Sequence, residues 1–467
     1  MSLTLSEFER IALPTLSTYA TIECLSPAFD EHWRERGHID QAIELLAQWA
    51  RLRVFAQFDV DIVRLEGRTP VLVVTVEATN DDDATVVLYG HMDKQPPLGD
   101  WSEGLAPYEP VRRGDRLYAR GVADDGYSTF AALLALESLE KGEQPHSRCV
   151  VLIEASEESG SPDLDAYLDV LSERLGHVEL MICLDSGALT YDRLWVTSSL
   201  RGLASVDVTV EVLTRGQHSG SASGIVPSSF RILRQLLDRL EDAETGVVLV
   251  PELHGEIPEA AHHAAQEIAL EFGESLHFGL PVVENLALMG SDVTERILNQ
   301  TWRPTLSIVG MAGLPPPEIA GNVLRPSTTA SLSFRLPPNV NAARAQRALE
   351  DLLTRDVPEG ALVSVRGHSA DGWSSPVVAE WLVTALEQSS QKYFGRGFSY
   401  TGEGGTIPFL ASLARRYPNV QFVATGVLGP DSNAHGVDEM LDLPTTIAVT
   451  NAVSSIVAAF AHRKDAQ

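Results

Sequence analysis

The 467-residue sequence predicts an α/β fold in which a mostly parallel mixed sheet is flanked by helices and a smaller α+β domain is inserted. The length exceeds what one hydrophobic core usually supports, so at least two domains are expected. Short apolar runs alternate with helical patterns in the first half, as in strand-helix-strand units. From about Leu203 the pattern changes to residue-by-residue alternation, which is typical of an antiparallel sheet with one solvated face.

The first half of the chain contains three expected strands and two expected helices. Apolar runs bounded by polar or glycine-rich residues predict buried strands over residues 86–91, 149–154 and 180–185. Apolar residues at helical spacing predict helices over residues 127–139 and 164–175.

Residues 201–370 are expected to form the inserted α+β domain. Val206, Val208 and Val210 alternate with polar residues along one half-buried strand. A helix, a strand, a second helix and a further strand are then expected over residues 228–240, 328–336, 342–353 and 361–367. Residues 245–302 show no sustained period and are interpreted as an insertion within this domain.

Beyond Gly372 the pattern returns to longer helices, which are expected over residues 377–394 and 444–461 with a strand over residues 420–425 between them. The chain is therefore expected to re-enter its first domain, so that residues 1–200 and 371–467 together form the larger domain.

Charge and composition exclude several classes of partner. The formal net charge of −29 would repel phosphates, so no binding to nucleic acid or to an anionic membrane is expected. The N-terminus lacks a basic stretch followed by an apolar segment, and no run of about eighteen apolar residues suggests a bilayer span. The three cysteines, Cys24, Cys149 and Cys183, form neither a disulfide framework nor a Cys-x-x-Cys clamp, which favours a reducing cytoplasm.

Acidic and histidine residues occur where the expected strands end. The segment His91-Met92-Asp93 ends the first strand, and Asp185 ends the third. The carboxyl edge of an open α/β sheet is where ligands bind. His91 could ligate a metal while Asp93 holds its other ring nitrogen, although an isolated His-x-Asp is more often a surface hydrogen bond. An unpaired carboxylate at Asp185 would be costly at the end of a buried strand.

Two further acidic segments support the same interpretation. Asp124 precedes the helix expected over residues 127–139, where a carboxylate could either bridge two divalent ions or cap the helix. Glu157 and Glu158 follow the second strand, and adjacent carboxylates repel unless a cation or a shared proton relieves them. One of the pair could ligate a metal while its neighbour acts as a base.

These segments, in this order, resemble the di-zinc aminoacylase, carboxypeptidase and dipeptidase family, most closely its carnosine dipeptidase and glutamate carboxypeptidase branch. The resemblance covers nearly the whole chain and rests on GHMD, LYARGVADDG, EASEESGS, LDSG, GQHSG, SFRLPPN, EGGTIP and NAHGVDE. It implies a metal-dependent hydrolase that cleaves an amide bond in a dipeptide or small peptide with a free carboxylate. Deacylation of an N-acyl amino acid is the alternative, because it needs the same metal centre and carboxylate clamp.

The resemblance also implies roles for individual residues. The ligands of two divalent ions, with zinc expected and manganese or cobalt as alternatives, would be His91, Asp124, Glu158, Asp185 and His435. Asp124 would bridge the ions, Glu157 would be the general base, and Asp93 would orient His91.

The resemblance further implies that residues 1–200 and 371–467 form the catalytic domain, and that residues 201–370 act as a lid, carry a dimer contact and supply substrate contacts. His218 would reach the substrate carbonyl oxygen from a partner subunit, which implies a homodimer, and Arg335 would hold the substrate carboxylate. Gly405 and Thr406 resemble a loop that also contacts this carboxylate. A solvated histidine and a surface ion pair are the alternatives for His218 and Arg335.

Two other classes of protein fit less well. A non-catalytic metal-binding scaffold predicts loss of the base or of a ligand, yet Glu157 and all five ligand positions are present. A nucleophilic hydrolase lacks its Gly-x-Ser-x-Gly turn here, because GQHSG places histidine where the serine would stand. One departure from the family pattern is Gly126-Tyr127, where many members have lysine and glycine. It leaves the metal-bearing position unchanged and bears on the start of the following helix and on substrate preference.

Overall fold

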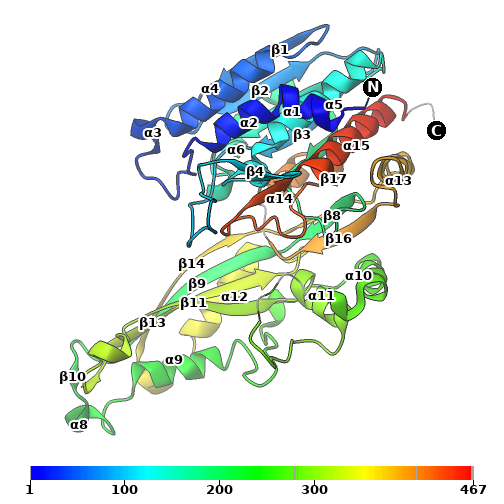
Figure 1. The fold of residues 1–467 in the computed structure, drawn as a ribbon. Helices are drawn as coiled ribbons and strands as arrows, with labels where there is room; N and C mark the ends of the chain where they lie inside the picture. Colours follow the sequence, from blue (N-terminus) through cyan, green and yellow to red (C-terminus); the bar gives the residue numbers. More distant parts are fainter. Residues whose placement is uncertain (1, 277–279, 281, 406–407, 464–467) are drawn as a thin grey trace. The chain divides into compact units, whose positions relative to one another are not determined.

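The computed structural model describes residues 2–276, 280, 282–405 and 408–463, which form two compact units (Figure 1). The first unit comprises Met1–Ser198, Ser375–Thr401 and Ser412–Gln467. The second unit comprises Ser199–Ser374 and Gly402–Ala411. The chain therefore passes into the second unit twice, first for the long segment Ser199–Ser374 and again for the short segment Gly402–Ala411, and returns to the first unit each time.

A large mixed sheet has the strand order β1-β2-β6-β3-β7-β17-β8-β15, with β16 also paired to β8. Its strands are β1 (Phe58–Val63), β2 (Val71–Val76), β3 (Ala84–His91), β6 (Arg148–Glu154), β7 (His177–Cys183), β8 (Trp195–Leu200), β15 (Trp373–Ser374), β16 (Ser399–Glu403) and β17 (Gln421–Ala424). The four central strands, β6, β3, β7 and β17, run parallel to their neighbours, while the β1–β2, β2–β6, β17–β8 and β8–β15 pairs are antiparallel. This confirms the predicted mixed sheet and confines its parallel part to the centre.

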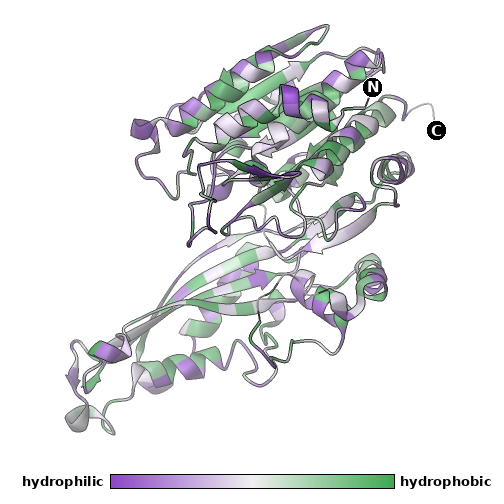
Figure 2. Cartoon of the chain, in the orientation of Figure 1, coloured by the Kyte–Doolittle hydropathy of each residue, from purple (hydrophilic) through white to green (hydrophobic). Residues whose placement is uncertain are grey.

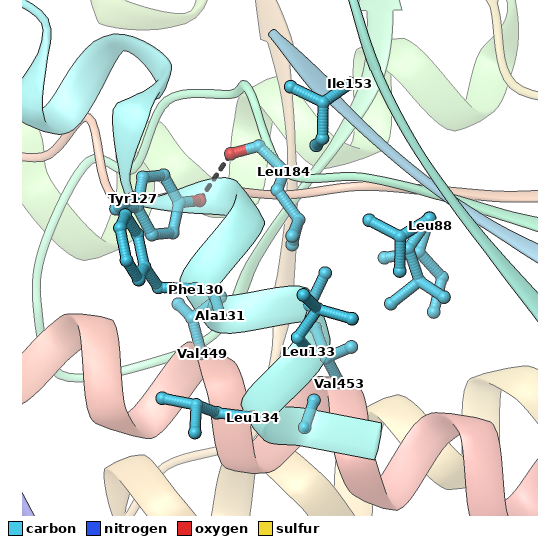
Figure 3. Close-up of a cluster of buried hydrophobic side chains, with 14 of the residues drawn as sticks. Leu88, Tyr127, Phe130, Ala131, Leu133, Leu134, Ile153, Leu184, Val449 and Val453 are labelled. Atoms are coloured by element: carbon cyan, nitrogen blue, oxygen red, sulfur yellow. Dashed lines mark hydrogen bonds between the residues drawn. The ribbon is translucent and has the colours of Figure 1, made fainter. Parts of the chain in front are cut away.

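Two apolar helices form the core beside these central strands. The helix α5 (Ser128–Lys141) contacts β3 and β6, and it also packs against α15 (Leu443–Ala461). Leu133 and Leu134 of α5 lie with Val449 and Val453 of α15 in this core (Figure 3). Strand β3 is buried along its whole length, as expected for a parallel strand covered on both faces.

The C-terminal helix α15 has a capped N-terminus and contributes apolar side chains to the core. The Asp442 carboxylate accepts a hydrogen bond from the Thr445 backbone N–H at 2.9 Å, and a proline lies in the first turn. Among the described residues, α15 is the one helix whose length and hydropathy would suit a bilayer, contrary to the expectation that no such run exists. Its most apolar window is 67% buried in the protein, which is typical of a core helix.

The remaining helices of the first unit surround this core or cap its ends. They are α1 (Leu5–Ile11), α2 (Leu13–Ala20), α3 (Trp33–Arg36), α4 (His38–Arg51), α6 (Leu164–Val170), α7 (Ser172–Leu175) and α13 (Glu380–Phe394); α14 (Pro408–Arg416) belongs partly to each unit. A small sheet of β4 (Val111–Arg113), β5 (Arg116–Tyr118) and β18 (Met440–Asp442) joins segments distant in sequence. The single helix expected over residues 164–175 is divided at Leu171 into α6 and α7.

The second unit is built on an antiparallel sheet of order β11-β13-β9-β14. Its strands are β9 (Gly202–Glu211), β11 (Thr305–Ala312), β13 (Ser327–Leu336) and β14 (Leu362–Ala370). Alternate residues of β9 and β13 are buried, which confirms the period-two pattern and gives the strands their banded colouring in Figure 2. The helices α9 (Ser229–Leu237) and α12 (Ala342–Thr354) pack against this sheet.

The segment interpreted as an irregular insertion contains regular structure. Residues 245–302 include the helices α10 (Glu259–Phe272) and α11 (Val293–Thr301), which pack against each other. Only two residues of α10 are buried, Ala265 and Ile268, so its sequence lacks the broad apolar stripe by which a surface helix is usually found. The short elements β10 (Gln217–His218), β12 (Val323–Leu324) and α8 (Ser219–Ala222) complete the unit.

Candidate metal centre

The four central parallel strands end at one edge of the sheet, and each is followed by a side chain suited to bind a metal. His91 is the last residue of β3, and Glu157 and Glu158 form a single helical turn after β6. Asp185 follows β7, and His435 lies in the loop after β17. Because parallel neighbouring strands end on the same side, the fold brings these residues together.

Asp124 lies between the two histidines. It belongs to the turn Val122–Gly126 that precedes α5, and its own backbone angles, φ −120° and ψ 92°, are not helical. One carboxylate oxygen, Oδ1, is 3.2 Å from His91 Nε2, and the other, Oδ2, is 2.9 Å from His435 Nε2. His435 Nε2 is also 3.3 Å from Glu158 Oε1. Asp124 therefore stands where a carboxylate that bridges two ions would have to stand.

The same ring nitrogen of His91 lies near two more carboxylates. Asp185 Oδ2 is 3.7 Å and Glu157 Oε2 is 4.0 Å from His91 Nε2. Two sets of three ligand atoms each lie within 4.8 Å of one another, namely those of His91, Glu157 and Asp185 and those of His91, Asp124 and Glu158. The sites overlap at His91, and His435 lies beside the second set.

Crowded acids and histidines shift one another's pKa. Burial raises the pKa of Glu157 well above its usual value, and the charges of Asp185 and Glu158 raise it further. Burial alone lowers the pKa of His435, but the carboxylates of Asp124 and Glu158 outweigh that effect and raise it to about 11. His91 behaves in the same way, with Asp124 and Asp93 raising its pKa. Positive charge is therefore strongly favoured at both histidines.

The donor set fits a divalent cation. His91 Nε2 is fully buried and makes no hydrogen bond of normal geometry with any described residue, although three carboxylates surround it. A buried ring nitrogen without a hydrogen bond is costly, and a metal ion would satisfy its lone pair. Imidazole and carboxylate ligands together suit zinc and also accept manganese or cobalt.

Asp93 contacts more than His91. Its backbone carbonyl oxygen is 3.1 Å and its carboxylate Oδ1 is 3.5 Å from His91 Nδ1. The same carboxylate accepts hydrogen bonds from the backbone N–H groups of Glu157 and Glu158, at 3.1 and 3.0 Å. Asp93 thus ties the segment that follows β3 to the turn that follows β6.

Several supporting residues were not singled out from the sequence. Gln95 Nε2 donates to Glu158 Oε2 at 2.6 Å, and Asp125 Oδ2 accepts from the His91 backbone N–H at 3.1 Å. Glu439 accepts hydrogen bonds from the loop that carries Asp124. These residues lie inside or beside recognised motifs, but only their side-chain directions in three dimensions reveal the contacts.

The departure at Gly126-Tyr127 has a clear structural role. A Cβ atom at Gly126 would lie 2.2 Å from the Tyr19 ring and 2.3 Å from the Gly121 carbonyl oxygen, so only glycine fits there. The buried Tyr127 hydroxyl donates to the carbonyl oxygen of Leu184, immediately before Asp185 (Figure 3). Tyr127 therefore links the start of α5 to the segment that carries a candidate ligand.

The residues expected to contact substrate belong to the second unit. His218 is exposed at the end of β10, and its Nδ1 accepts a hydrogen bond from the Gly220 N–H at 3.1 Å. Arg335 is half-buried on β13. Burial and the charge of Arg335 both lower the pKa of Arg201, so two guanidinium groups lie near each other. Gly405 is exposed, and Thr406 lies outside the described residues.

Comparison with known proteins agrees with this geometry. Residues 87–459 match peptidase family M20/M25/M40. A cysteinylglycine-S-conjugate dipeptidase from Corynebacterium striatum is 26% identical over 385 residues, which cover 80% of this chain and 80% of that protein. A Beta-Ala-His dipeptidase from Homo sapiens is 24% identical over 385 residues, covering 80% of this chain and 74% of that protein.

Solved structures share the fold at low sequence identity. A dipeptidase from Saccharomyces cerevisiae aligns with a TM-score of 0.76 at 19% identity, covering 98% of this chain and 97% of its own. An M20 family metallo-carboxypeptidase from Sulfolobus solfataricus aligns with a TM-score of 0.78 at 21% identity, covering 96% and 99%. With the match over most of its length and the acidic edge described above, this chain belongs to peptidase family M20/M25/M40 and is a metal-dependent peptidase.

Proposed function

We propose that the protein is a dipeptidase that hydrolyses the amide bond of a dipeptide or small peptide with a free carboxylate. The observation that carries this proposal is the convergence of five ligand-type side chains and Glu157 at the carboxyl edge of the central strands. The names of the relatives, which include a cysteinylglycine-S-conjugate dipeptidase and a Beta-Ala-His dipeptidase, support a dipeptide as substrate.

Two divalent ions are assigned to this edge, with zinc as the expected ion. His91, Asp124 and Asp185 would hold one ion, and Asp124, Glu158 and His435 would hold the other. When bound, such ions acidify water and polarise a carbonyl group. The position of Asp124 between the two histidine Nε2 atoms, 3.2 and 2.9 Å away, supports a shared ligand.

Glu157 is assigned the proton transfers. Burial and neighbouring carboxylates raise the pKa of Glu157 well above its usual value, which suits a group that accepts a proton near neutral pH. It would take a proton from the attacking water and pass it to the leaving amine. Asp93 holds the backbone N–H of Glu157 at 3.1 Å and so fixes the direction of the base.

Recognition of the substrate is assigned to the second unit. Arg335 would bind the substrate carboxylate through its planar guanidinium group, with Gly405 and Thr406 as further contacts. Arg201 supports this assignment, because it is 9% exposed and burial together with the charge of Arg335 lowers its pKa to about 10. Two partly buried guanidinium groups near each other favour the binding of an anion such as the substrate carboxylate. His218 would contact the substrate of a partner subunit.

A homodimer formed through the second unit follows from that role of His218. The strand β11 lies at the edge of the antiparallel sheet and exposes Ile308, Val309 and Met311. An apolar edge strand is a surface that a second strand covers readily. Val309→Lys is expected to convert dimers to monomers in light-scattering measurements of molar mass; a wild-type protein that is already monomeric contradicts the homodimer.

A reducing cytoplasm is the proposed location. Cys24, Cys149 and Cys183 are all free and buried, which suits a compartment in which thiols stay reduced. Fractionation of the producing cells tests this assignment, and recovery from an oxidising compartment contradicts it.

The decisive experiment measures turnover of dipeptides and N-acyl amino acids by metal-depleted protein before and after addition of zinc, manganese or cobalt. Metal-dependent cleavage of dipeptides is expected for the wild type. Glu157→Ala is expected to bind the same number of ions but to lose about 100- to 10,000-fold in kcat. Turnover of N-acyl amino acids alone would move the substrate to the deacylase class, and full activity of Glu157→Ala would contradict the assigned base.

A further inference from the structure

We propose that Glu439 is a positioning residue that holds two loops together and thereby sets the affinity of the metal centre. The Asp124 loop is residues 119–127, between β5 and α5, and the His435 loop is residues 425–439, between β17 and β18. The two loops lie far apart in sequence, since 315 positions separate Asp124 from Glu439. This inference rests on the proposed metal centre and adds a residue that contacts no assigned ligand side chain.

Within the described part of the chain, the hydrogen bonds to the Glu439 carboxylate come from one short segment. Its Oε1 accepts from the backbone N–H groups of Ala123 and Asp124, at 3.0 and 3.2 Å. Its Oε2 accepts from the backbone N–H of Gly121 at 2.9 Å and from Arg120 Nη1 at 2.8 Å. The backbone of the candidate bridging ligand is therefore held directly by Glu439.

Arg120 closes the clamp on the other loop. Its second guanidinium nitrogen, Nη2, donates to the carbonyl oxygen of Gly436, the residue after His435. Arg120 and Glu439 are 1% and 0% exposed, so water cannot replace their contacts. The Glu439 backbone carbonyl also accepts from the Ala119 N–H at 3.2 Å. The same pair of residues thus binds both loops.

The His435 loop needs external support. His435, Asn433 and Asp438 have φ angles of 62°, 49° and 59°, in the left-handed region that side-chain-bearing residues seldom adopt. Such backbone conformations persist when surrounding contacts hold them. Asp438 is fixed by the Ser102 backbone N–H at 2.9 Å, and Glu439 anchors the end of the loop.

The clamp sets the geometry that a metal ion would meet. His435 Nε2 and Asp124 Oδ2 lie 2.9 Å apart and come from the two clamped loops. If the loops separate, the ligands must be brought together again when an ion binds, and that reorganisation weakens binding. Loss of outer contacts of this kind typically costs about 10- to 100-fold in metal affinity.

Glu439→Gln is the first test, because it keeps the shape and removes the charge. One amide position becomes an N–H₂ donor that faces either Arg120 or the two backbone N–H groups, so at least one pair of hydrogen bonds is lost. Zinc and manganese affinities of metal-depleted full-length protein are measured by competition with a chelator. The expected result is about a 10- to 100-fold loss of affinity, with kcat restored in part by excess metal and KM for the peptide within about twofold.

Glu179→Gln is the control, since it also removes a carboxylate that pairs with a buried arginine. Glu179 Oε2 is 2.7 Å from Arg463 Nη2, and Glu179 lies on β7, the strand whose other end leads to Asp185. Glu179→Gln is expected to lower stability but leave metal affinity unchanged. Equal losses of affinity in both variants would overturn the proposal.

Arg120→Lys keeps the test decisive if Glu439→Gln does not fold. Lysine retains the buried positive charge beside Glu439 but cannot contact Glu439 and Gly436 together. A loss of metal affinity, smaller than that of Glu439→Gln, is expected. Wild-type affinity in the folded variants overturns the clamp, whereas a wild-type protein that binds no ion overturns the proposed metal centre itself.

Discussion

Two regions of the molecule concentrate charge of opposite sign. The carboxyl edge of the central strands in the first unit buries Asp93, Asp124, Asp125 and Asp185 around His91. The second unit instead places Arg201 near Arg335, and burial and this second cation lower the pKa of Arg201 to about 10. Like charges held together are costly, and a ligand of opposite charge relieves the cost. The first region therefore suits cations and the second suits an anion.

The difference extends to how each region is held. At the acidic edge the candidate ligands come from four strand ends and a turn, and Asp93 and Glu439 accept backbone hydrogen bonds that tie these segments together. Arg201 is held by its own unit, with donations to the carbonyl oxygen of Gly404 and to Thr305 Oγ1, both at 3.2 Å. Removing one group from each region should therefore affect different parts of the reaction.

The largest effect is expected at the bridging position of the acidic edge. Asp124→Asn removes the charge shared by the two candidate sites, and several kcal/mol of lost transition-state stabilisation corresponds to about 1,000-fold or more in kcat/KM. Metal content per chain should fall as well. Asp163→Asn, at an aspartate paired with Arg68 at 2.7 Å, is the control and should keep near wild-type activity. Full metal content and activity in Asp124→Asn would contradict the role of Asp124 as a ligand shared by two ions.

The next effect separates the cationic region from the acidic one. Arg335→Ala should lower kcat/KM about 10- to 100-fold for dipeptides with a free carboxylate, because a charge-assisted hydrogen bond is lost. Methyl esters or amides of the same dipeptides should lose little. Arg231→Ala, at an exposed arginine paired with Glu359, is the control. Equal losses for both classes of substrate would show that Arg335 does not bind the substrate carboxylate.

A smaller effect concerns stability within the acidic edge. Glu154 is buried with the hydroxyl groups of Tyr89 and Ser161 as donors, and burial raises its pKa from 4.5 to about 7. The folded state thus favours the protonated acid, and that contribution, about 3 kcal/mol at most, is lost as pH rises from 4.5 through 7. Glu154→Gln should therefore gain stability relative to the wild type between pH 5 and pH 8.

Denaturant unfolding of metal-free protein at several pH values measures that difference. The exposed Glu173→Gln should unfold in parallel with the wild type at every pH. A Glu154→Gln curve that is also parallel to the wild type would show that the pKa of Glu154 is not raised in the folded protein.

Much of the fold and of the site could be predicted from local patterns. Period-two alternation predicted β9 and β13, because burial on one face makes every second residue apolar. Continuous apolar runs predicted β3 and β6, because these strands are buried on both faces. Strand ends marked by His91, Glu157, Glu158 and Asp185 predicted one shared edge. The helix α10 was missed, because a mostly exposed helix carries little apolar period.

The sequence by itself determined the kinds of ligand and the strand ends that carry them, since both depend on residues close together in the chain. Only the tertiary structure decided which atoms meet: Asp124 between His91 and His435, Asp93 beneath Glu157 and Glu158, and Glu439 across both loops. The physical reason is that these contacts join segments up to 319 residues apart, and side-chain direction at that distance depends on packing rather than on local sequence.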